Sequence, residues 1–205
     1  MIISRTPFRI SFFGGGTDYP AWYEKNTGAV LSTTIDKYCY ISIRHLPPFF
    51  GHKHRIVYSY IENVKDIEEI RHPVVRLLLR LFKVKKGVEV HHDGDLPARS
   101  GLGSSSAFAV GMLNCLHALN GKIISKFDLA QQAINLERNL LKENVGSQDQ
   151  IAVAYGGLNK IIFHSDHNFR VEPMTLSKER LGQLQAHLML VFTGLSRVAS
   201  LSPYL

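Results

Sequence analysis

The hydrophobic and polar positions in the first third of the chain follow a strand pattern. Residues 2–13 alternate and then turn apolar, which predicts a strand that stops at three consecutive glycines, Gly14 to Gly16. Segments rich in branched and aromatic side chains predict three more strands, antiparallel to one another, at residues 29–35, 39–44 and 55–60. A short helix is expected near residues 19–24.

Helical spacing appears in the middle of the chain and then alternates with strands. Residues 62–83 are predicted to be helical, because apolar and basic side chains recur at helical spacing within residues 72–82. The other predicted elements are a strand at 87–92, a helix at 107–119, a helix at 125–141 that starts at Ser125 with Asp128, a short helix capped by Ser147, and a strand at 187–193. Together they predict an α+β domain with helices on one side of a largely antiparallel sheet.

Composition narrows the class of partner. The 205 residues are 45% apolar and carry a formal charge of +7, but lysine and arginine are spread along the chain without a long basic run. This distribution favours anionic small molecules such as nucleotides and sugar phosphates. It disfavours an RNA-binding domain, in which aromatic residues would be interleaved with a basic stripe.

The cysteines and the amino terminus indicate a cellular compartment. Cys39 and Cys115 lie in apolar segments, which predicts buried free thiols in a reducing cytosol. The first residues lack the features of a signal peptide, and no apolar run reaches the ~20 residues that span a bilayer. We therefore expect a cytoplasmic protein with no nucleic-acid or membrane partner.

A glycine-rich loop between the strand at 87–92 and the next helix is the main candidate site. Gly101 and Gly103 allow close approach of a ligand, and three serines follow where a helix leaves its first amide groups unpaired. Such a loop suits a polyphosphate, although serine is also an ordinary helix cap. It is neither a Walker A loop nor a dinucleotide fingerprint. The candidate nucleotide-binding residues are Pro97, Arg99, Ser100, Gly101, Leu102, Gly103, Ser104, Ser105 and Ser106.

Three charged residues outside this loop are candidates, each with an ordinary structural alternative. Arg9 precedes the triple glycine and would otherwise form a surface ion pair. Glu137 shares a helix face with apolar residues and should point inward, where it needs a cation or a buried salt bridge. Asp149 lies in the first turn of a short helix, where aspartate is favoured by the helix dipole alone.

Taken together, these segments resemble the GHMP kinases. Pro97-x-x-x-Gly101-Leu-Gly-Ser-Ser resembles their phosphate loop, Pro7-Phe-Arg-Ile-Ser-Phe-Phe-Gly-Gly-Gly-Thr-Asp-Tyr19 their substrate motif, and Gly146-x-x-Asp-Gln150 the segment of the catalytic aspartate. The resemblance implies a ribosomal protein S5 domain 2-like amino-terminal domain over residues 1–180. Residues 181–205 would then be the truncated start of a ferredoxin-like carboxy-terminal domain. Either the chain is a fragment or a truncated product, or another chain, as in a homodimer, covers its unpaired strand.

The resemblance also implies a role for each site residue. ATP would bind the loop from Gly101 to Ser106, and Mg²⁺ would bind Ser105 and Glu137, with Ser104 and Ser106 as alternatives to Ser105. Asp149 would act as the base, Arg9 would lie near the transferred phosphoryl group, and Asp18 would contact the sugar. Gly15 and Gly16 stand where galactokinases carry glutamate and histidine, which implies a bulkier or already charged sugar.

Within the family, the triple glycine and Gln148-Asp149-Gln150 resemble the branch that phosphorylates the anomeric hydroxyl of D-glycero-D-manno-heptose 7-phosphate. The implied substrate-binding residues are Gly14, Gly15, Gly16, Thr17, Asp18 and Arg197. The basic residues that could hold a substrate phosphate are Lys37, Arg44, Arg99 and Arg197, which the sequence does not rank. The alternatives are another sugar-1-kinase, acting on fucose or a similar sugar, and an inactive relic that still binds nucleotide.

Overall fold

The computed structural model describes residues 1–97 and 100–191. In this part of the chain, seven strands form one sheet: β1 (Ile2–Phe13), β2 (Gly28–His45), β3 (His54–Val57), β4 (Ile61–Val64), β5 (Val88–Gly94), β6 (Leu158–Phe163) and β7 (Phe169–Pro173). All neighbouring strands are antiparallel except β3 and β5, which are parallel. The predicted α+β class with a largely antiparallel sheet is therefore confirmed.

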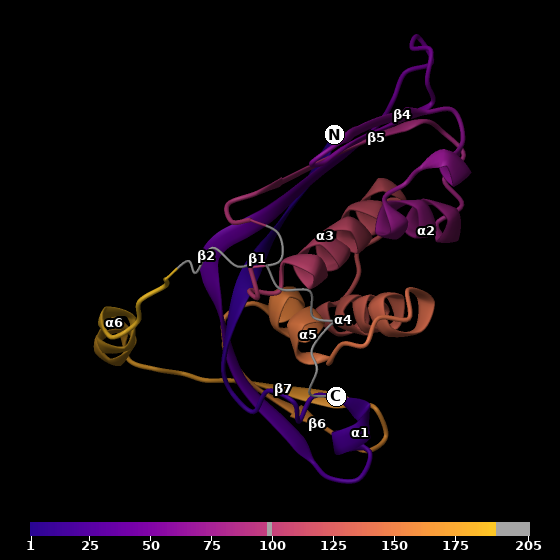
Figure 1. The fold of residues 1–205 in the computed structure, drawn as a ribbon. Helices are drawn as coiled ribbons and strands as arrows, with labels where there is room; N and C mark the ends of the chain where they lie inside the picture. Colours follow the sequence, from indigo (N-terminus) through magenta and orange to yellow (C-terminus); the bar gives the residue numbers. More distant parts are fainter. Residues whose placement is uncertain (98–99, 192–205) are drawn as a thin grey trace.

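Four helices cover one face of this sheet, as Figure 1 shows: α2 (Pro73–Leu81), α3 (Ser104–Leu119), α4 (Lys126–Ile134) and α5 (Gln148–Tyr155). A π-helical turn, η2 (Asn135–Leu140), continues α4, and a 3₁₀ turn, η1 (Ile67–Glu69), precedes α2. The short helix α1 (Pro20–Tyr23) lies beside the β6–β7 hairpin, and α6 (Lys178–Ala186) stands away from the covered face (Figure 1). None of the described helices is long and apolar enough to cross a membrane.

Strand β2 runs through the whole sheet. Its residues 39–45 pair with β5 and its residues 28–33 pair with β6, while β1 pairs along the opposite side. The sequence pattern predicts two strands here because Asp36 and Lys37 interrupt the apolar run. Both residues are exposed within one continuous strand, so the interruption is a solvent-facing stretch and not a turn.

Helix α3 forms the centre of the core. Ten of its sixteen residues are buried, because it packs on β1 and β2 and also contacts α4 and α5. A helix that is apolar on most of its surface is stable only when it is covered in this way. Cys115 on α3 and Cys39 on β2 are buried free thiols, as predicted.

Two further predicted elements are wrong. Residues 61–64 form strand β4 and not the start of a helix, because they pair with β3 and place Glu62 where it accepts the backbone N–H groups of Arg71 and His72 at 2.6 and 3.1 Å. Residues 188–191 form no strand, and Met189 is 87% exposed, because no described strand pairs with them. The rest of that predicted strand lies outside the described residues, and the domain division near residue 180 stays a prediction.

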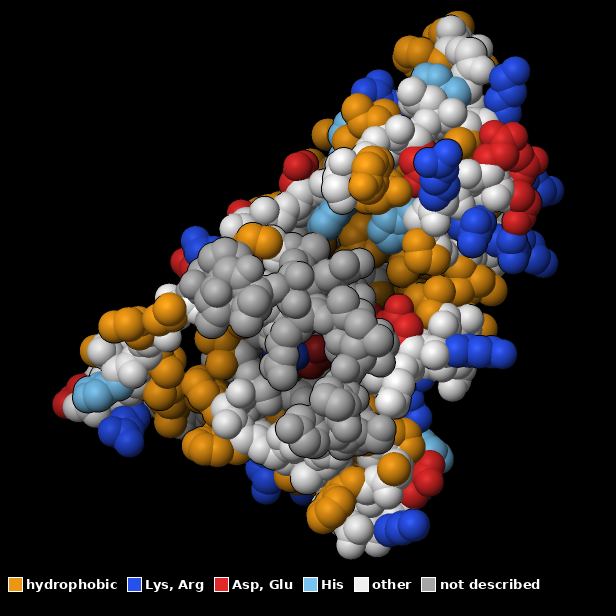
Figure 2. Space-filling model, in the orientation of Figure 1, with side chains coloured by type: hydrophobic (Ala, Val, Ile, Leu, Met, Phe, Trp, Pro, Cys, Tyr) orange, Lys and Arg blue, Asp and Glu red, His pale blue; other side chains and the backbone are white. Residues whose placement is uncertain are grey.

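The surface charge is mixed. On the face drawn in Figure 2, lysine and arginine side chains are scattered among acidic and apolar ones and form no single basic stripe.

Candidate active site

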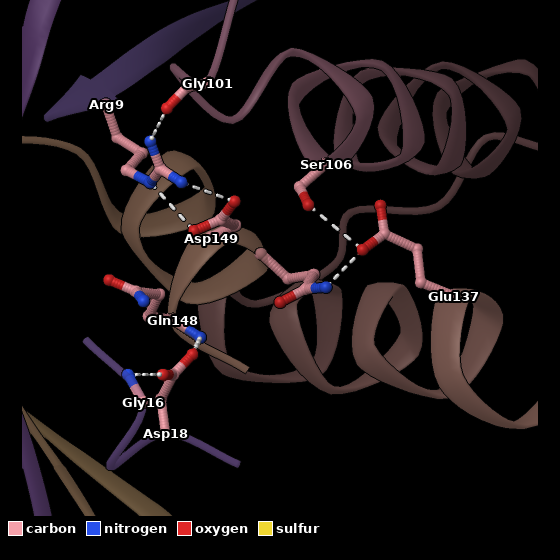
Figure 3. A network of polar contacts seen from close by, with 9 residues as sticks. Arg9, Gly16, Asp18, Gly101, Ser106, Glu137, Gln148 and Asp149 are labelled. Carbon is pink, nitrogen blue, oxygen red and sulfur yellow. Dashed lines mark hydrogen bonds and ion pairs between the residues drawn. The ribbon is translucent and has the colours of Figure 1, made fainter. Parts of the chain in front are cut away.

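Arg9 and Asp149 meet although 140 positions separate them. Arg9 donates from Nε to Asp149 Oδ1 at 2.8 Å and from Nη2 to Oδ2 at 2.6 Å, a two-point ion pair (Figure 3). Its Nη1 donates to the Gly101 carbonyl oxygen at 2.7 Å. One guanidinium group therefore ties the end of β1 to the glycine-rich loop and to the first turn of α5.

The local backbone explains why Arg9 reaches this loop. The pairing of β1 with β2 changes register between Pro7 and Arg9, and the Arg9 N–H donates to the Leu102 carbonyl oxygen at 3.0 Å instead. Gly103 follows with φ of 74°, and a Cβ there would lie 3.0 Å from Arg9 Cγ. Only glycine combines this conformation with room for the arginine stem. Gly103 is also the residue before α3, so the serines begin the helix as predicted.

Glu137 lies beside this ion pair and is almost fully buried, with 2% of its surface exposed. Its Oε2 accepts hydrogen bonds from Ser106 Oγ at 3.0 Å and from Gln150 Nε2 (Figure 3). Its Oε1 is buried and has no hydrogen-bond partner among the described residues. The inward orientation is confirmed, and no lysine or arginine in the described part of the chain pairs with the carboxylate, so the salt-bridge alternative fails.

The environment of Glu137 favours its neutral form in the ligand-free protein. Burial raises the pKa of this carboxyl group to about 8, and the negative charges of Glu143 and Asp149 raise it further. The hydrogen bonds from Gln150 and Ser106 act in the opposite direction but are weaker. A bound cation would reverse this balance, because it would favour the ionised carboxylate.

Asp18, the predicted sugar-binding aspartate, has a structural role in the described fold. Its carboxylate is fully buried and accepts the backbone N–H groups of Gly16 and Gln148, each at 3.1 Å (Figure 3). The Asp18 carboxylate thus occupies the capping position at α5 that was predicted for Ser147, whose side chain makes no cap hydrogen bond. Burial and the nearby Asp149 raise the pKa of Asp18, and these backbone hydrogen bonds lower it. The Asp18 carboxylate thus holds the glycine turn against α5, and its contact with a sugar stays a prediction.

The triple-glycine turn has one fixed end and one open end. Gly14 has φ of 88°, and a Cβ there would meet the Ala29 carbonyl oxygen, so this residue packs against β2. Thr17 fastens the same turn, because its hydroxyl accepts the Ala29 N–H at 3.1 Å. A Cβ on Gly15 would meet only Gln148 Nε2, at 3.9 Å, and one on Gly16 would meet nothing within 4 Å. Both positions therefore have room for a larger group, and the bulkier or charged sugar stays a prediction.

The structure separates the remaining candidates. Ser106 contacts Glu137, whereas Ser105, the serine predicted to share a metal with it, is exposed one position earlier. Arg44 donates to Glu89, ten residues along β2 from Thr34, the partner of Arg9, which is a length of about 33 Å measured along the strand. Lys37 is exposed on the same strand. Arg99 and Arg197 lie outside the described residues.

Gln150 was missed as a site residue. It is fully buried, and its amide links α5, which carries Asp149, to the π-helical turn that carries Glu137. The sequence contained one signal for it, since a glutamine directly after a candidate base, in a buried helix, must satisfy its polar atoms inside the protein. No pattern in the sequence indicated which partner it would find.

Comparison with known proteins agrees with this geometry. Residues 68–157 match the family model of the GHMP kinases N terminal domain. A D-glycero-alpha-D-manno-heptose 7-phosphate kinase from Campylobacter jejuni is 27% identical over 97% of this chain, and a galactokinase from Pyrococcus furiosus is 25% identical over 99%. The chain spans 61% and 56% of the lengths of these two relatives.

A crystal structure of a D-glycero-D-manno-heptose 1-phosphate kinase from Bacteroides thetaiotaomicron superimposes with a TM-score of 0.81 at 23% identity. The match covers 91% of this chain and 64% of that one, and it shows that the fold is shared. The motifs and the convergence of Arg9, Glu137 and Asp149 on one glycine-rich loop fit this similarity: residues 68–157 match the GHMP kinases N terminal domain, and the chain shares the fold of a sugar kinase of known structure.

Proposed function

We propose that this protein transfers the γ-phosphoryl group of ATP to the anomeric hydroxyl of a heptose phosphate, D-glycero-D-manno-heptose 7-phosphate. The observation that carries the proposal is the convergence of Arg9, Asp149 and Glu137 at the amino end of α3. Phosphoryl transfer needs positioned oxygens and charge neutralisation more than covalent chemistry. The similarity to the Campylobacter jejuni enzyme supports the choice of sugar.

Asp149 is the proposed base. Its carboxylate is 28% exposed at the edge of the glycine-rich loop, and Arg9 holds both of its oxygens. A carboxylate in this position can accept the proton of an anomeric hydroxyl, which is more acidic than that of an ordinary alcohol. The Arg9 guanidinium group lies between the base and the loop, where it can stabilise negative charge on the transferred group.

The residues around Glu137 fit a magnesium ion. Glu137 Oε1 is buried and has no hydrogen-bond partner among the described residues, so a divalent cation would satisfy it. Magnesium binds few protein oxygens together with substrate phosphates, which fits this arrangement. Glu137 would hold the ion with a serine hydroxyl of the first turn of α3, for which Ser106 has the direct contact and Ser105 the exposed position. When bound, the ion would neutralise charge on the β- and γ-phosphates.

Gln150→Leu tests the arrangement around this carboxylate. The substitution removes one of the two donors to Glu137 Oε2, so we expect the KM for Mg·ATP to rise ten- to hundredfold, with a smaller change in kcat. Steady-state kinetics with varied Mg·ATP measure this. The control is Gln132→Leu, which removes a glutamine that contacts His117 on the other side of α4. An unchanged KM in Gln150→Leu would show that Gln150 does not orient the glutamate.

Gly15→Glu tests the proposed sugar position. The added Cβ has room, so folding should be preserved, but the carboxylate would enter the open side of the glycine turn and repel a phosphorylated sugar. We expect the KM for heptose 7-phosphate to rise at least tenfold and the melting temperature to change by no more than a few degrees. Gly15→Ala is the matched control and should keep the KM within about threefold. If both variants bind the sugar equally well, the sugar does not lie against Gly15.

The direct test is turnover of heptose 7-phosphate with Mg·ATP, compared with fucose and galactose under the same conditions. Transfer to the heptose phosphate at least tenfold above the other sugars supports the proposal. A clear preference for fucose would favour the related sugar-1-kinase. Binding of Mg·ATP without turnover of any sugar would favour a nucleotide-binding relic.

A further inference from the structure

A pocket of about 360 Å³ lies between α1, η2 and the turn that joins β6 to β7. We call it the Arg138 pocket; its walls include Tyr23, Asn135, Arg138, Ser147, Phe163 and His167. Figure 1 shows α1 beside the β6–β7 hairpin, at the end of the sheet away from α2. The pocket thus combines aromatic side chains with amide, hydroxyl and basic groups, a mixture that suits a small polar ligand.

Arg138 has a positive charge without a matching negative one. Its Nη1 donates to Tyr23 Oη at 2.8 Å and to Ser147 Oγ at 3.2 Å, and both acceptors are neutral. No carboxylate in the described part of the chain lies within 4.0 Å of its guanidinium nitrogens. A partly buried cation with only neutral partners has lost hydration without gaining an ion pair, so the remaining N–H groups favour an anion.

The rim of the pocket does not supply that anion. The acidic side chain that pairs with a residue of the rim is that of Glu24, 3.7 Å from His167 Nε2, and both side chains are about half exposed. Solvent weakens this ion pair, and Glu24 contacts His167 at the rim and not Arg138. Arginine presents a planar set of donors that matches a phosphate group, and histidine at the rim adds a further donor.

One residue of the pocket wall, Ser147, adjoins the catalytic segment in the sequence. Ser147, which accepts from Arg138, directly precedes Gln148, whose N–H binds Asp18, and it lies two residues before Asp149. We propose that the Arg138 pocket binds a phosphate monoester, and that this is the distal phosphate of the sugar substrate. The second half of this statement rests on the proposed kinase function. The first half rests on the unpaired arginine alone.

Calorimetric titration of the chain with heptose 7-phosphate, with the same heptose lacking its phosphate, and with inorganic phosphate tests the inference. We expect Arg138→Leu to weaken binding of the sugar phosphate about ten- to hundredfold and to leave the weak binding of the free sugar unchanged. The matched control is Arg170→Leu, which removes an exposed arginine that pairs with Glu172 on β7. It should keep the wild-type affinity.

Arg138→Lys separates anion binding from a structural role. Lysine keeps the charge but cannot reproduce the two hydrogen bonds to Tyr23 and Ser147, so a purely structural arginine would be lost equally in both variants. We expect Arg138→Lys to keep the affinity for the sugar phosphate within about tenfold of wild type. Thermal unfolding of each variant shows that the comparison is made on folded protein.

The outcomes are distinct. Equal affinity of wild type and Arg138→Leu for both the sugar phosphate and inorganic phosphate overturns the inference. Inorganic phosphate that depends on Arg138 but is not displaced by the sugar phosphate overturns the assignment to the substrate and supports a site for free phosphate. Mg·ATP titration is the separate arm: if Mg·ATP does not bind while phosphate binding still depends on Arg138, the kinase proposal fails and the pocket stands.

Discussion

Asp149→Asn is expected to lower phosphoryl transfer about 10²- to 10⁴-fold while Mg·ATP binding stays within about threefold of wild type. The amide keeps the size of the side chain and one acceptor for Arg9 but cannot take the proton of the sugar hydroxyl. The loop that would hold the nucleotide and the carboxylate of Glu137 are unchanged. Single-turnover transfer from ATP, beside calorimetric titration with Mg·ATP, measures the two effects separately.

The control for Asp149→Asn is Asp128→Asn. It removes the same charge from the first turn of another helix, α4, where the side chain contacts Ser125 and no residue of the site. Transfer by this variant should equal that of wild type. Near-normal transfer by Asp149→Asn would remove Asp149 from the role of base, and the ion pair with Arg9 would then be a structural feature only.

Local chemistry made the glycine-rich loop predictable. Gly103 has a left-handed backbone conformation, and the apolar residues that follow it in the sequence predict a buried helix. The strand that ends at Gly14 and the helix that carries Asp149 were predicted for the same reason, since turn residues and periodic apolar positions lie close together in the sequence. These features gave the right elements, but their meeting in space came from the family resemblance.

Long-range contacts could not be predicted in this way. The Arg9–Asp149 pair joins residues 140 positions apart and depends on a register change in β1, which leaves no mark in the residue pattern. The Asp18 carboxylate replaces Ser147 as the cap of α5 for a similar reason. A serine before a helix predicts a cap from local sequence, but in α5 a buried carboxylate from a distant turn accepts the first helical N–H, that of Gln148, and the Ser147 side chain caps none.

The π-helical turn η2 could not be predicted from the spacing of apolar residues. Ideal helical spacing predicts that Leu140 shares the buried face of Glu137, yet Leu140 is 42% exposed. A π-helical turn adds a residue to the repeat, so positions after Glu137 rotate away from the core. The inward orientation of Glu137 was predicted correctly, but the prediction that Leu140 lies on the same buried face was wrong.

Glu137→Gln is expected to change both ligand binding and the pH dependence of folding. The pKa of this carboxyl group is about 8 in the folded, ligand-free protein and 4.5 for an ordinary glutamate. Between these values the folded state holds a proton that the unfolded state has released, so the free energy of unfolding falls as pH rises, by up to about 1.4 kcal/mol per pH unit. Glutamine does not titrate and removes this contribution.

Urea unfolding of wild type and Glu137→Gln at pH 5, 7 and 9 measures the difference. The variant should gain stability relative to wild type as pH rises, by a few kcal/mol at pH 9, whereas Glu179→Gln, which removes an exposed carboxylate on α6, should follow the wild-type curve. Parallel curves for wild type and Glu137→Gln would mean that Glu137 does not titrate in this range.

The same substitution should weaken Mg·ATP binding at least tenfold, and the two results constrain each other. A metal ligand must be deprotonated, so wild-type affinity for Mg·ATP should rise with pH up to about 8 and then level off, with protons released on binding below that value. A burial cost alone would change stability but leave nucleotide affinity independent of pH. If Glu137→Gln loses the pH dependence of stability and also that of Mg·ATP affinity, the Glu137 carboxyl group causes both. The proton that this carboxyl group holds in the absence of a cation is the one that a bound cation must displace.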